Sequence, residues 1–287
     1  MSKAPSAILL MHCPNKIGIV ASVTDFISQN NGIIIHLDQH VTSESNHFYM
    51  RVEWSLDGFA IPREKIGDFF GTLVSPKYDL KWKLKFSDSL PRVCLFVSRY
   101  AHCFFDILSR YESGEWKIEI PLIISNHEKF KPVAERYNIP FHHFHITKEN
   151  KAQVEKEEIE LIKKNNVDFL VLARYMQILS DDFITHYPDK IINIHHSSLP
   201  AFKGANPYKA AYDRGVKFVG ATAHYVTADL DDGPIIAQNI ISITHNDTVR
   251  DLKRKGKDVE KIVLARAIWA HINHKIISHE NKTIVFA

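Results

Sequence analysis

The sequence is poor in cysteine, in long apolar runs and in an excess of either charge. Its 287 residues include three cysteines, and no two of them form a C-x-x-C pair. Because such an odd set does not build a disulfide framework, we expect a reducing compartment. No run approaches the roughly 18 apolar residues of a membrane helix, and the N-terminal apolar stretch that stops at His12 is too short for a secretory signal. We therefore expect a cytoplasmic protein with no membrane segment.

The charge balance argues against a large basic surface. Lysine and arginine number 36 and aspartate and glutamate 33, which leaves a net charge of +3, so we expect neither a nucleic-acid nor a membrane partner. Eleven glycines and 12 prolines exclude a collagen-like chain, and 45% hydrophobic residues exclude general disorder. At about 150 residues per domain, the length predicts two domains. The one unusual count is 17 histidines.

The first 87 residues predict a small unit of strands and two helices. Apolar residues recur at helical spacing after Gly18, and Asn30-Asn31-Gly32 is typical of a helix end. Alternating apolar and polar residues, or short apolar runs, predict four strands, and a second helix is also expected. In chain order the expected elements are a strand at 7–11, a helix after 18, strands at 33–41 and 48–54, a helix at 62–73 and a strand at 81–86. This βαββαβ order is ferredoxin-like.

After a linker at 88–92 the pattern changes, and residues 88–287 predict a second domain. Short apolar runs at 93–97, 122–124 and 169–173 alternate with helical stretches, which indicates an open, Rossmann-like, mostly parallel α/β sheet. Active sites of such sheets lie at the carboxyl ends of the strands. The charged stretch at 148–164 is expected to be an exposed helix with Val154, Ile159 and Ile162 inward, and the one at 250–261 is expected to be a solvated helix face.

A dense polar cluster follows one predicted strand of this domain. Asn193 and His195 are two residues apart on an extended stretch, so their side chains point the same way, whereas His196 faces the other side and is expected to be structural. An amide beside an imidazole suits a developing carbonyl oxyanion. A strand end that turns into Pro200 is an equally good interpretation of the spacing alone.

A second polar cluster runs from Gly220 to Ile236 and contains two adjacent carboxylates. Asp231 and Asp232 precede a Gly-Pro turn, and an aspartate there can simply cap a loop. A carboxylate near an imidazole can instead orient it, or position a water as general base. The D-x-G pattern is weak alone and becomes specific together with the N-x-H pattern upstream.

Together these residues resemble the formyltransferase superfamily, whose members use 10-formyltetrahydrofolate. The shared pattern is N-x-H at Asn193 and His195, then L-P, then H-Y-V-x-x-x-L-D-x-G-P-I-I from His224 to Ile236. The resemblance implies that Asn193, His195 and Asp231 form the catalytic trio, with His224 in support. Asp231 takes the carboxylate role because the superfamily pattern is D-x-G. The resemblance covers the chain from about Arg92 onward.

The same resemblance implies a folate-binding segment and no cofactor. The stretch from Leu172 to Leu179 is similar to the segment whose backbone meets the pterin, which makes Arg174, Tyr175, Met176 and Ile178 candidate substrate-binding residues. Folate is then the substrate, and no metal is required because an activated water can attack a formamide carbonyl. His142, His143 and His145 do not suggest a metal site either, since their spacing on a strand does not converge on one ion.

The N-terminal unit, with its C-P-N-K-I-G-I-V opening, resembles an ACT domain. The resemblance thus implies an ACT-like regulatory domain at 1–87 and a formyltransferase-like catalytic domain at 88–287. This order is similar to that of the superfamily members that hydrolyse 10-formyltetrahydrofolate to tetrahydrofolate and formate. That reaction supplies formate and free folate to one-carbon and purine metabolism. The resemblance further implies a homo-oligomer and an amino-acid effector. His12 lies near a strand-to-helix turn that is either part of an effector site or a plain turn.

The alternative is formyl transfer to an amine such as glycinamide ribonucleotide. Enzymes with that activity carry a glycine-rich phosphate loop after their first strand, and the corresponding stretch at 98–103 contains no glycine. Two features of the sequence depart from the pattern of the hydrolytic members, and the second of them resembles the amine-transferring members. Ser198 stands where a bulky phenylalanine is expected, and the stretch from Lys203 to Asn206 fits the F-K-G-x-N of the transferases.

Overall fold

The computed structural model describes residues 4–201 and 207–287, and the chain divides into two compact units. The first unit contains the chain up to residue 89 together with 273–279 and 284–287, and the second contains 90–272 and 280–283. The predicted boundary at residues 87 and 88 lies close to this division. The prediction placed the whole C-terminal end in the second domain, however, whereas most of the last 15 residues pack with the first unit.

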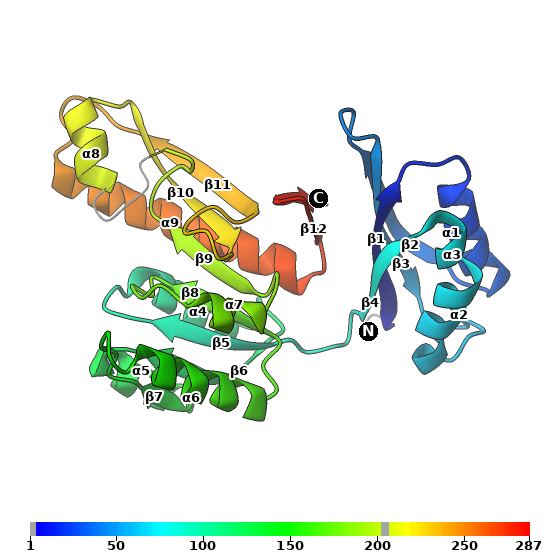
Figure 1. The fold of residues 1–287 in the computed structure, drawn as a ribbon, viewed down its shortest axis with the longest axis horizontal. Helices are drawn as coiled ribbons and strands as arrows, with labels where there is room; N and C mark the ends of the chain where they lie inside the picture. The colour runs from blue at the N-terminus through cyan, green and yellow to red at the C-terminus, as the bar shows by residue number, and fades with distance from the viewer. Residues whose placement is uncertain (1–3, 202–206) are drawn as a thin grey trace. The chain divides into compact units, whose positions relative to one another are not determined.

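The first unit has the predicted βαββαβ order (Figure 1). Its strands form an antiparallel sheet in the order β2-β3-β1-β4. The elements are β1 (Ser6–Pro14), α1 (Ile19–Gln29), β2 (Ile34–Val41), β3 (His47–Ser55), α2 (Ile66–Leu73), α3 (Ser75–Tyr78) and β4 (Lys81–Phe86). The predicted helix at 62–73 begins later, at Ile66, because a 3-10 turn at Arg63–Lys65 follows Pro62.

Strand β1 is buried on both faces of this sheet. Leu9 and Met11 face the helices in the main core, while Leu10 on the opposite face packs with Tyr49 and with Ile277 and Phe286. The last two come from the C-terminal strands β12 (Ile276–His279) and β13 (Lys282–Val285) and the residues after them. Double-sided burial explains why the β1 sequence is a continuous apolar run rather than an alternating one.

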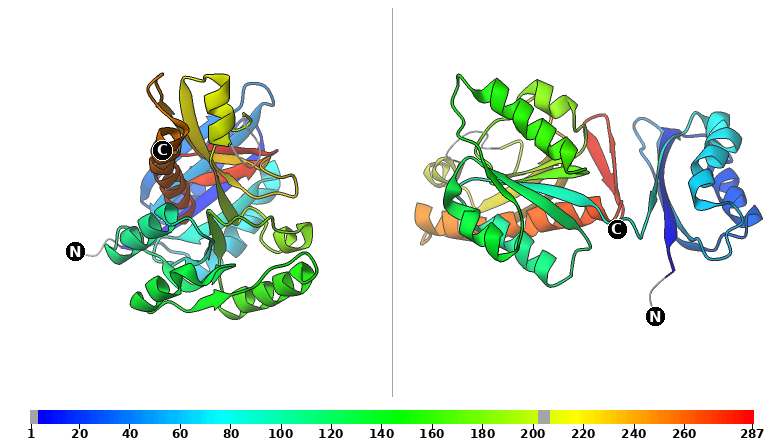
Figure 2. Two further views of the ribbon diagram at one scale, coloured as in Figure 1. Left: turned by 90° about the vertical axis from the view of Figure 1, so that its left-hand side faces the viewer. Right: turned by 90° about the horizontal axis from the view of Figure 1, so that it is seen from below.

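The second unit contains a seven-stranded sheet in the order β11-β10-β9-β8-β5-β6-β7 (Figures 1 and 2). Strands β9, β8, β5, β6 and β7 are parallel, and β10 pairs antiparallel with both β9 and β11. The strands are β5 (Arg92–Val97), β6 (Glu119–Ser125), β7 (Phe141–His143), β8 (Phe169–Ala173), β9 (Ile191–His195), β10 (Phe218–Tyr225) and β11 (Ile235–Ser242). The mostly parallel α/β sheet predicted for this part of the chain is confirmed.

Helices cover both faces of this sheet, as Figure 2 shows. On one face α4 and α9 contact each other, and α9 crosses β9, β10 and β11. On the other face α6 and α7 contribute to a core with alternate residues of β5, β6 and β8. The helices are α4 (His102–Glu112), α5 (Lys131–Arg136), α6 (Lys151–Lys164), α7 (Asp181–Thr185), α8 (Pro207–Arg214) and α9 (Val249–Ile272). Among the described residues no helix is long and apolar enough to cross a membrane.

Two charged stretches that predict solvated helix faces are only partly solvated. In α6, Glu155 and Glu158 are buried beside Ile159 and Ile162, and in α9 Glu260 is buried. The inward positions predicted for Val154, Ile159 and Ile162 are confirmed, whereas the prediction that the charged side chains are solvated is wrong at these three glutamates. Burial, and after it the neighbouring Glu155, raises the pKa of Glu158 to about 8.

Glu158 makes the stability of the second unit fall with rising pH. Its pKa is about 8 in the folded chain and 4.5 as an unperturbed group, so between these values the unfolded chain has lost a proton that the folded chain still holds. The free energy of unfolding then falls by up to about 1.4 kcal/mol per pH unit through this group. We expect Glu158→Gln to remove that slope, as measured by urea unfolding between pH 5 and pH 8. The exposed Glu160→Gln is the control, and parallel pH profiles for the two variants would contradict the assignment.

Candidate active site

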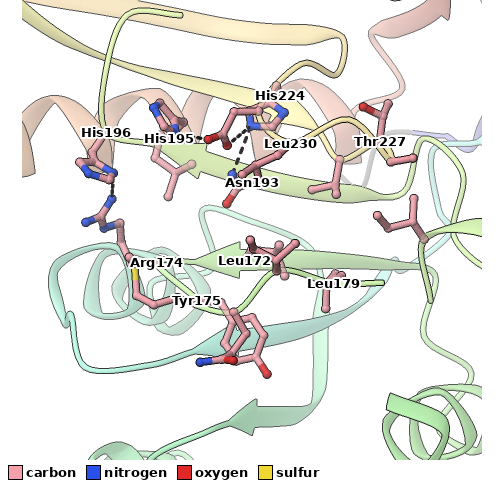
Figure 3. Close-up of a pocket in the computed structure, with 18 residues that line it drawn as sticks. Leu172, Arg174, Tyr175, Leu179, Asn193, His195, His196, His224, Thr227 and Leu230 are labelled. Carbon is pink, nitrogen blue, oxygen red and sulfur yellow. Dashed lines mark hydrogen bonds and ion pairs between the residues drawn. The ribbon is translucent and has the colours of Figure 1, made fainter. Parts of the chain in front are cut away.

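Antiparallel pairing of β9 and β10 brings three predicted site residues together. Asn193 and His195 alternate with the buried Ile192 and Ile194 along β9. Both therefore point to the face of the sheet opposite to these two isoleucines. His224 of β10 lies directly opposite Asn193 in the register. These three side chains therefore lie at one end of the sheet (Figure 3).

The loop between β10 and β11 brings Asp231 to the same point. Asp231 itself has a left-handed backbone with φ of 55°. Two residues later, a Cβ on Gly233 would lie 1.9 Å from the backbone oxygen of Tyr225, so only glycine allows the loop to approach the strand this closely. The glycine of the D-x-G pattern is thus required by packing, and its effect is to place the carboxylate beside the strand residues.

The four side chains form one hydrogen-bonded cluster. Oδ2 of Asp231 lies 3.0 Å from Nδ1 of His195, and its Oδ1 lies 3.6 Å from Nε2 of His224. Nδ2 of Asn193 lies 3.1 Å from the same Nε2. Because Nδ1 of His224 is 2.9 Å from the carbonyl oxygen of Tyr225, that nitrogen carries a proton and donates it. The other ring nitrogen, Nε2, faces both the side-chain amide of Asn193 and the carboxylate of Asp231.

Electrostatics keep the Asp231 carboxylate ionised. Burial alone would raise its pKa, but hydrogen bonds from His195 and His224 outweigh burial and hold the pKa well below the usual range. Nε2 of His195 is buried and has no hydrogen-bond partner within the described part of the chain. The cluster thus combines a fixed negative charge with a buried imidazole nitrogen available to a ligand, which suits a polar reaction at a carbonyl group.

A pocket of about 300 Å³ opens over this cluster, and its other walls are mainly apolar. The predicted substrate-binding residues Arg174, Tyr175, Met176 and Ile178 all border it. Met176 and Ile178 are 49% and 60% exposed and offer apolar surface to a ligand. The Tyr175 ring instead packs edge-on against Phe96, 5.1 Å between ring centroids, within the core. An apolar pocket with a few convergent polar groups is typical of a small-molecule site.

Arg174 belongs to a buried polar network that the sequence did not predict. Its Nε lies 3.3 Å from Oε2 of Glu260, and its Nη1 contacts Nδ1 of His196. Glu260 also accepts from Tyr208 at 2.6 Å and interacts with His102 at 2.7 Å. Burial and then Arg174 lower the pKa of His196 to about 4, so this ring is neutral and accepts. The network fixes the start of the 174–179 segment, where Arg174 has a φ of 62°.

Removing the carboxylate from this network should destabilise the second unit strongly. Glu260→Ala leaves the Arg174 guanidinium buried without its partner, and breaking one side of a buried ion pair costs about 3–5 kcal/mol. The neighbouring Asp258 pairs with Lys261 at the surface, and its replacement should cost less than about 1 kcal/mol. Guanidinium unfolding of Glu260→Ala and Asp258→Ala tests the difference. Equal losses in the two variants would show that the buried network contributes no more than a surface pair.

The turn after β5 differs from a phosphate-binding loop. It connects Val97 to α4 without a glycine, and the Tyr100 ring lies under the Arg174 guanidinium at 4.9 Å. A second cavity of about 190 Å³ borders this turn, with His102, Lys253 and Lys257 among its lining residues. The stretch from Lys203 to Asn206, which resembles the amine-transferring enzymes, lies outside the described residues.

A family model described as formyl transferase matches residues 91–268. The chain is 51% identical to a formyltetrahydrofolate deformylase of Synechocystis sp., over 98% of this chain and 99% of that protein, and 46% identical to one of Bacillus subtilis, over 97% and 93%. The crystal structure of a formyltetrahydrofolate deformylase from Pseudomonas syringae superimposes with a TM-score of 0.97 at 38% identity, over 100% of this chain and 96% of that one. A glycinamide ribonucleotide transformylase from Symbiobacterium toebii reaches 0.65 at 26% identity, over 71% of this chain and 98% of that one.

Proposed function

The chain belongs to the formyltetrahydrofolate deformylase family, and we propose that it hydrolyses 10-formyltetrahydrofolate to tetrahydrofolate and formate. The observation that carries the mechanism is the ionised Asp231 bonded to His195 at the floor of an apolar pocket. Similarity to the deformylases spans nearly the whole chain, whereas similarity to the transformylase covers 71% of it. The amine-transfer alternative is therefore not favoured.

In this mechanism Asp231 positions the attacking water. The apolar walls bind the folate ring system near Met176 and Ile178, and the formyl carbon lies above the polar cluster. Asp231 accepts a hydrogen bond from the water and takes its proton as the water oxygen bonds to the formyl carbon. The proton then passes to N10, the carbon–N10 bond breaks, and formate and tetrahydrofolate leave.

Asn193 and His195 stabilise the charge that develops on the formyl oxygen. Both side chains lie on one side of β9, within hydrogen-bond distance of His224 and Asp231 respectively. Donors held in place in advance act strongly where water is excluded, since no reorganisation is needed during the reaction. His224 fixes the Asn193 amide through Nε2. Folate is the substrate in this scheme, and the reaction uses water and side chains of this chain without a cofactor or catalytic metal.

The first unit acts in this proposal as an ACT-type regulatory domain that binds a small amino acid. The support is its four-stranded antiparallel βαββαβ architecture. The edge strand β2 and the residue before it expose Ile33, Ile34 and Ile35, which suits pairing with a second copy in a homo-oligomer. Light scattering of the purified chain is expected to give a mass above one chain. The formate released would enter one-carbon and purine metabolism.

The decisive experiment is formate release from 10-formyltetrahydrofolate as the sole substrate. We expect one formate for each tetrahydrofolate produced, with no dependence on an added amine. The same assay with glycinamide ribonucleotide present tests the alternative. Formate or formylated product that appears only with the amine would overturn the proposal.

A further inference from the structure

Three histidines converge on the face of the first unit's sheet that its helices leave uncovered. His12 comes from β1, His47 from β3 and His279 from β12, and all belong to the first unit. Each offers a ring nitrogen that lies within 4.8 Å of those of the other two. All three are partly exposed, so solvent reaches the cluster. The catalytic scheme above uses none of them.

The three rings lie in contact with one another. Nδ1 of His12 lies 3.0 Å from Nε2 of His47. The ring centroids are 5.2 Å apart for His12 and His47, 4.6 Å for His12 and His279, and 4.3 Å for His47 and His279. The nitrogens of His12 and His47, which are 3.0 Å apart, can both bind one ion at the roughly 2.0–2.1 Å of a Zn–N bond.

The chemistry of the cluster suits a borderline transition metal. Each of the three side chains offers one imidazole nitrogen, and an unprotonated imidazole supplies the lone pair that a metal needs. Within the described residues the cluster consists of imidazoles alone. Imidazole donors favour zinc over magnesium or calcium, which prefer oxygen ligands.

A buried tyrosine orients one of the rings. The Tyr49 hydroxyl lies 2.8 Å from Nδ1 of His279, and the Tyr49 side chain is buried between the sheet and the C-terminal strands. When that Nδ1 donates to the hydroxyl oxygen, Nε2 is left as the metal-binding nitrogen of His279. Metal-bound histidines typically make this kind of outer hydrogen bond.

We propose that His12, His47 and His279 bind one Zn²⁺ ion, with Tyr49 as a positioning residue and water in the fourth place. The ion joins β12 to β1 and β3, and so holds the C-terminal end of the chain on the N-terminal sheet. Its role is structural or regulatory and separate from the hydrolytic site. The proposal does not depend on the proposed function.

The test is a titration of the chelator-treated full chain with Zn²⁺ alone. We expect one ion per chain, loss of that binding in His279→Ala, and binding about 10–100-fold weaker in Tyr49→Phe. Zn²⁺ should also raise the Tm of the native chain and leave that of His279→Ala unchanged. The matched control is His36→Ala, which removes an exposed histidine from the same sheet and should bind as the native chain does.

Two results would overturn the proposal. One is the absence of a saturable site in the native chain. The other is zinc binding that persists in His279→Ala and disappears in His102→Ala, since His102, Cys103 and Glu260 form the second group of ligand-type side chains among the described residues. Circular dichroism of each variant, and the milder Tyr49→Phe change, separate lost binding from lost folding.

Discussion

Asp231→Asn is expected to lower kcat for formate release by about 10²–10⁴-fold, the contribution of a positioned general base. The change keeps the size of the side chain and removes its negative charge. His195 and His224 then lose the carboxylate that lies 3.0 Å and 3.6 Å from them, and the attacking water loses its proton acceptor. Steady-state formate release at saturating substrate measures the effect, and circular dichroism confirms that the chain is folded.

The neighbouring carboxylate provides a matched control for this prediction. Asp232 is exposed and carries the same charge one residue further along the loop. Asp232→Asn should keep kcat within about twofold of the native value, because a surface substitution outside the cluster removes no contact to the reacting atoms. Near-native turnover in Asp231→Asn, or equal losses in the two variants, would remove Asp231 from the role of base.

The second large effect is expected for Asn193→Ala, with a fall in kcat of about 10²–10³-fold, as for the loss of one oxyanion donor. The Asn193 amide lies 3.1 Å from His224 and borders the pocket. Its contribution should arise in the transition state, so KM should change little. Asn193 is only partly buried on β9, and the variant should remain folded.

Separate values of kcat and KM decide between two roles for Asn193. A rise in KM with unchanged kcat would show that the amide binds substrate and transition state equally, which contradicts an oxyanion role. Asn239 on β11 is the control, since it belongs to the same sheet and its side-chain oxygen accepts from the backbone N–H of Ile240. Asn239→Ala should retain both constants.

The sequence predicts those parts of the structure that depend on local patterns. Short apolar runs separated by helical stretches predict the parallel sheet, and the two-residue spacing of Asn193 and His195 predicts that they share a side of a strand. The Gly-Pro turn marks the loop that carries Asp231. These residues converge in space, and their catalytic roles stay predictions that the variants above test.

Other features depend on contacts between distant parts of the chain. Glu260 stands in a run of lysines and arginines, and contacts with Arg174, His102 and Tyr208 make its burial possible. The histidines that form the proposed zinc site are equally far apart in sequence. No local periodicity reports such pairings, because charge pattern along a helix does not show which other segment covers a given side chain.

The C-terminal packing on β1 has a consequence for synthesis of the chain. Leu10 and Tyr49 pack with Ile277, Ile284 and Phe286, so one face of the first sheet lacks these partners until residues 277–286 have been synthesised. Domains that lie early in a chain otherwise fold first during translation. This first unit therefore completes its packing only after residues 90–272 of the second unit have been made.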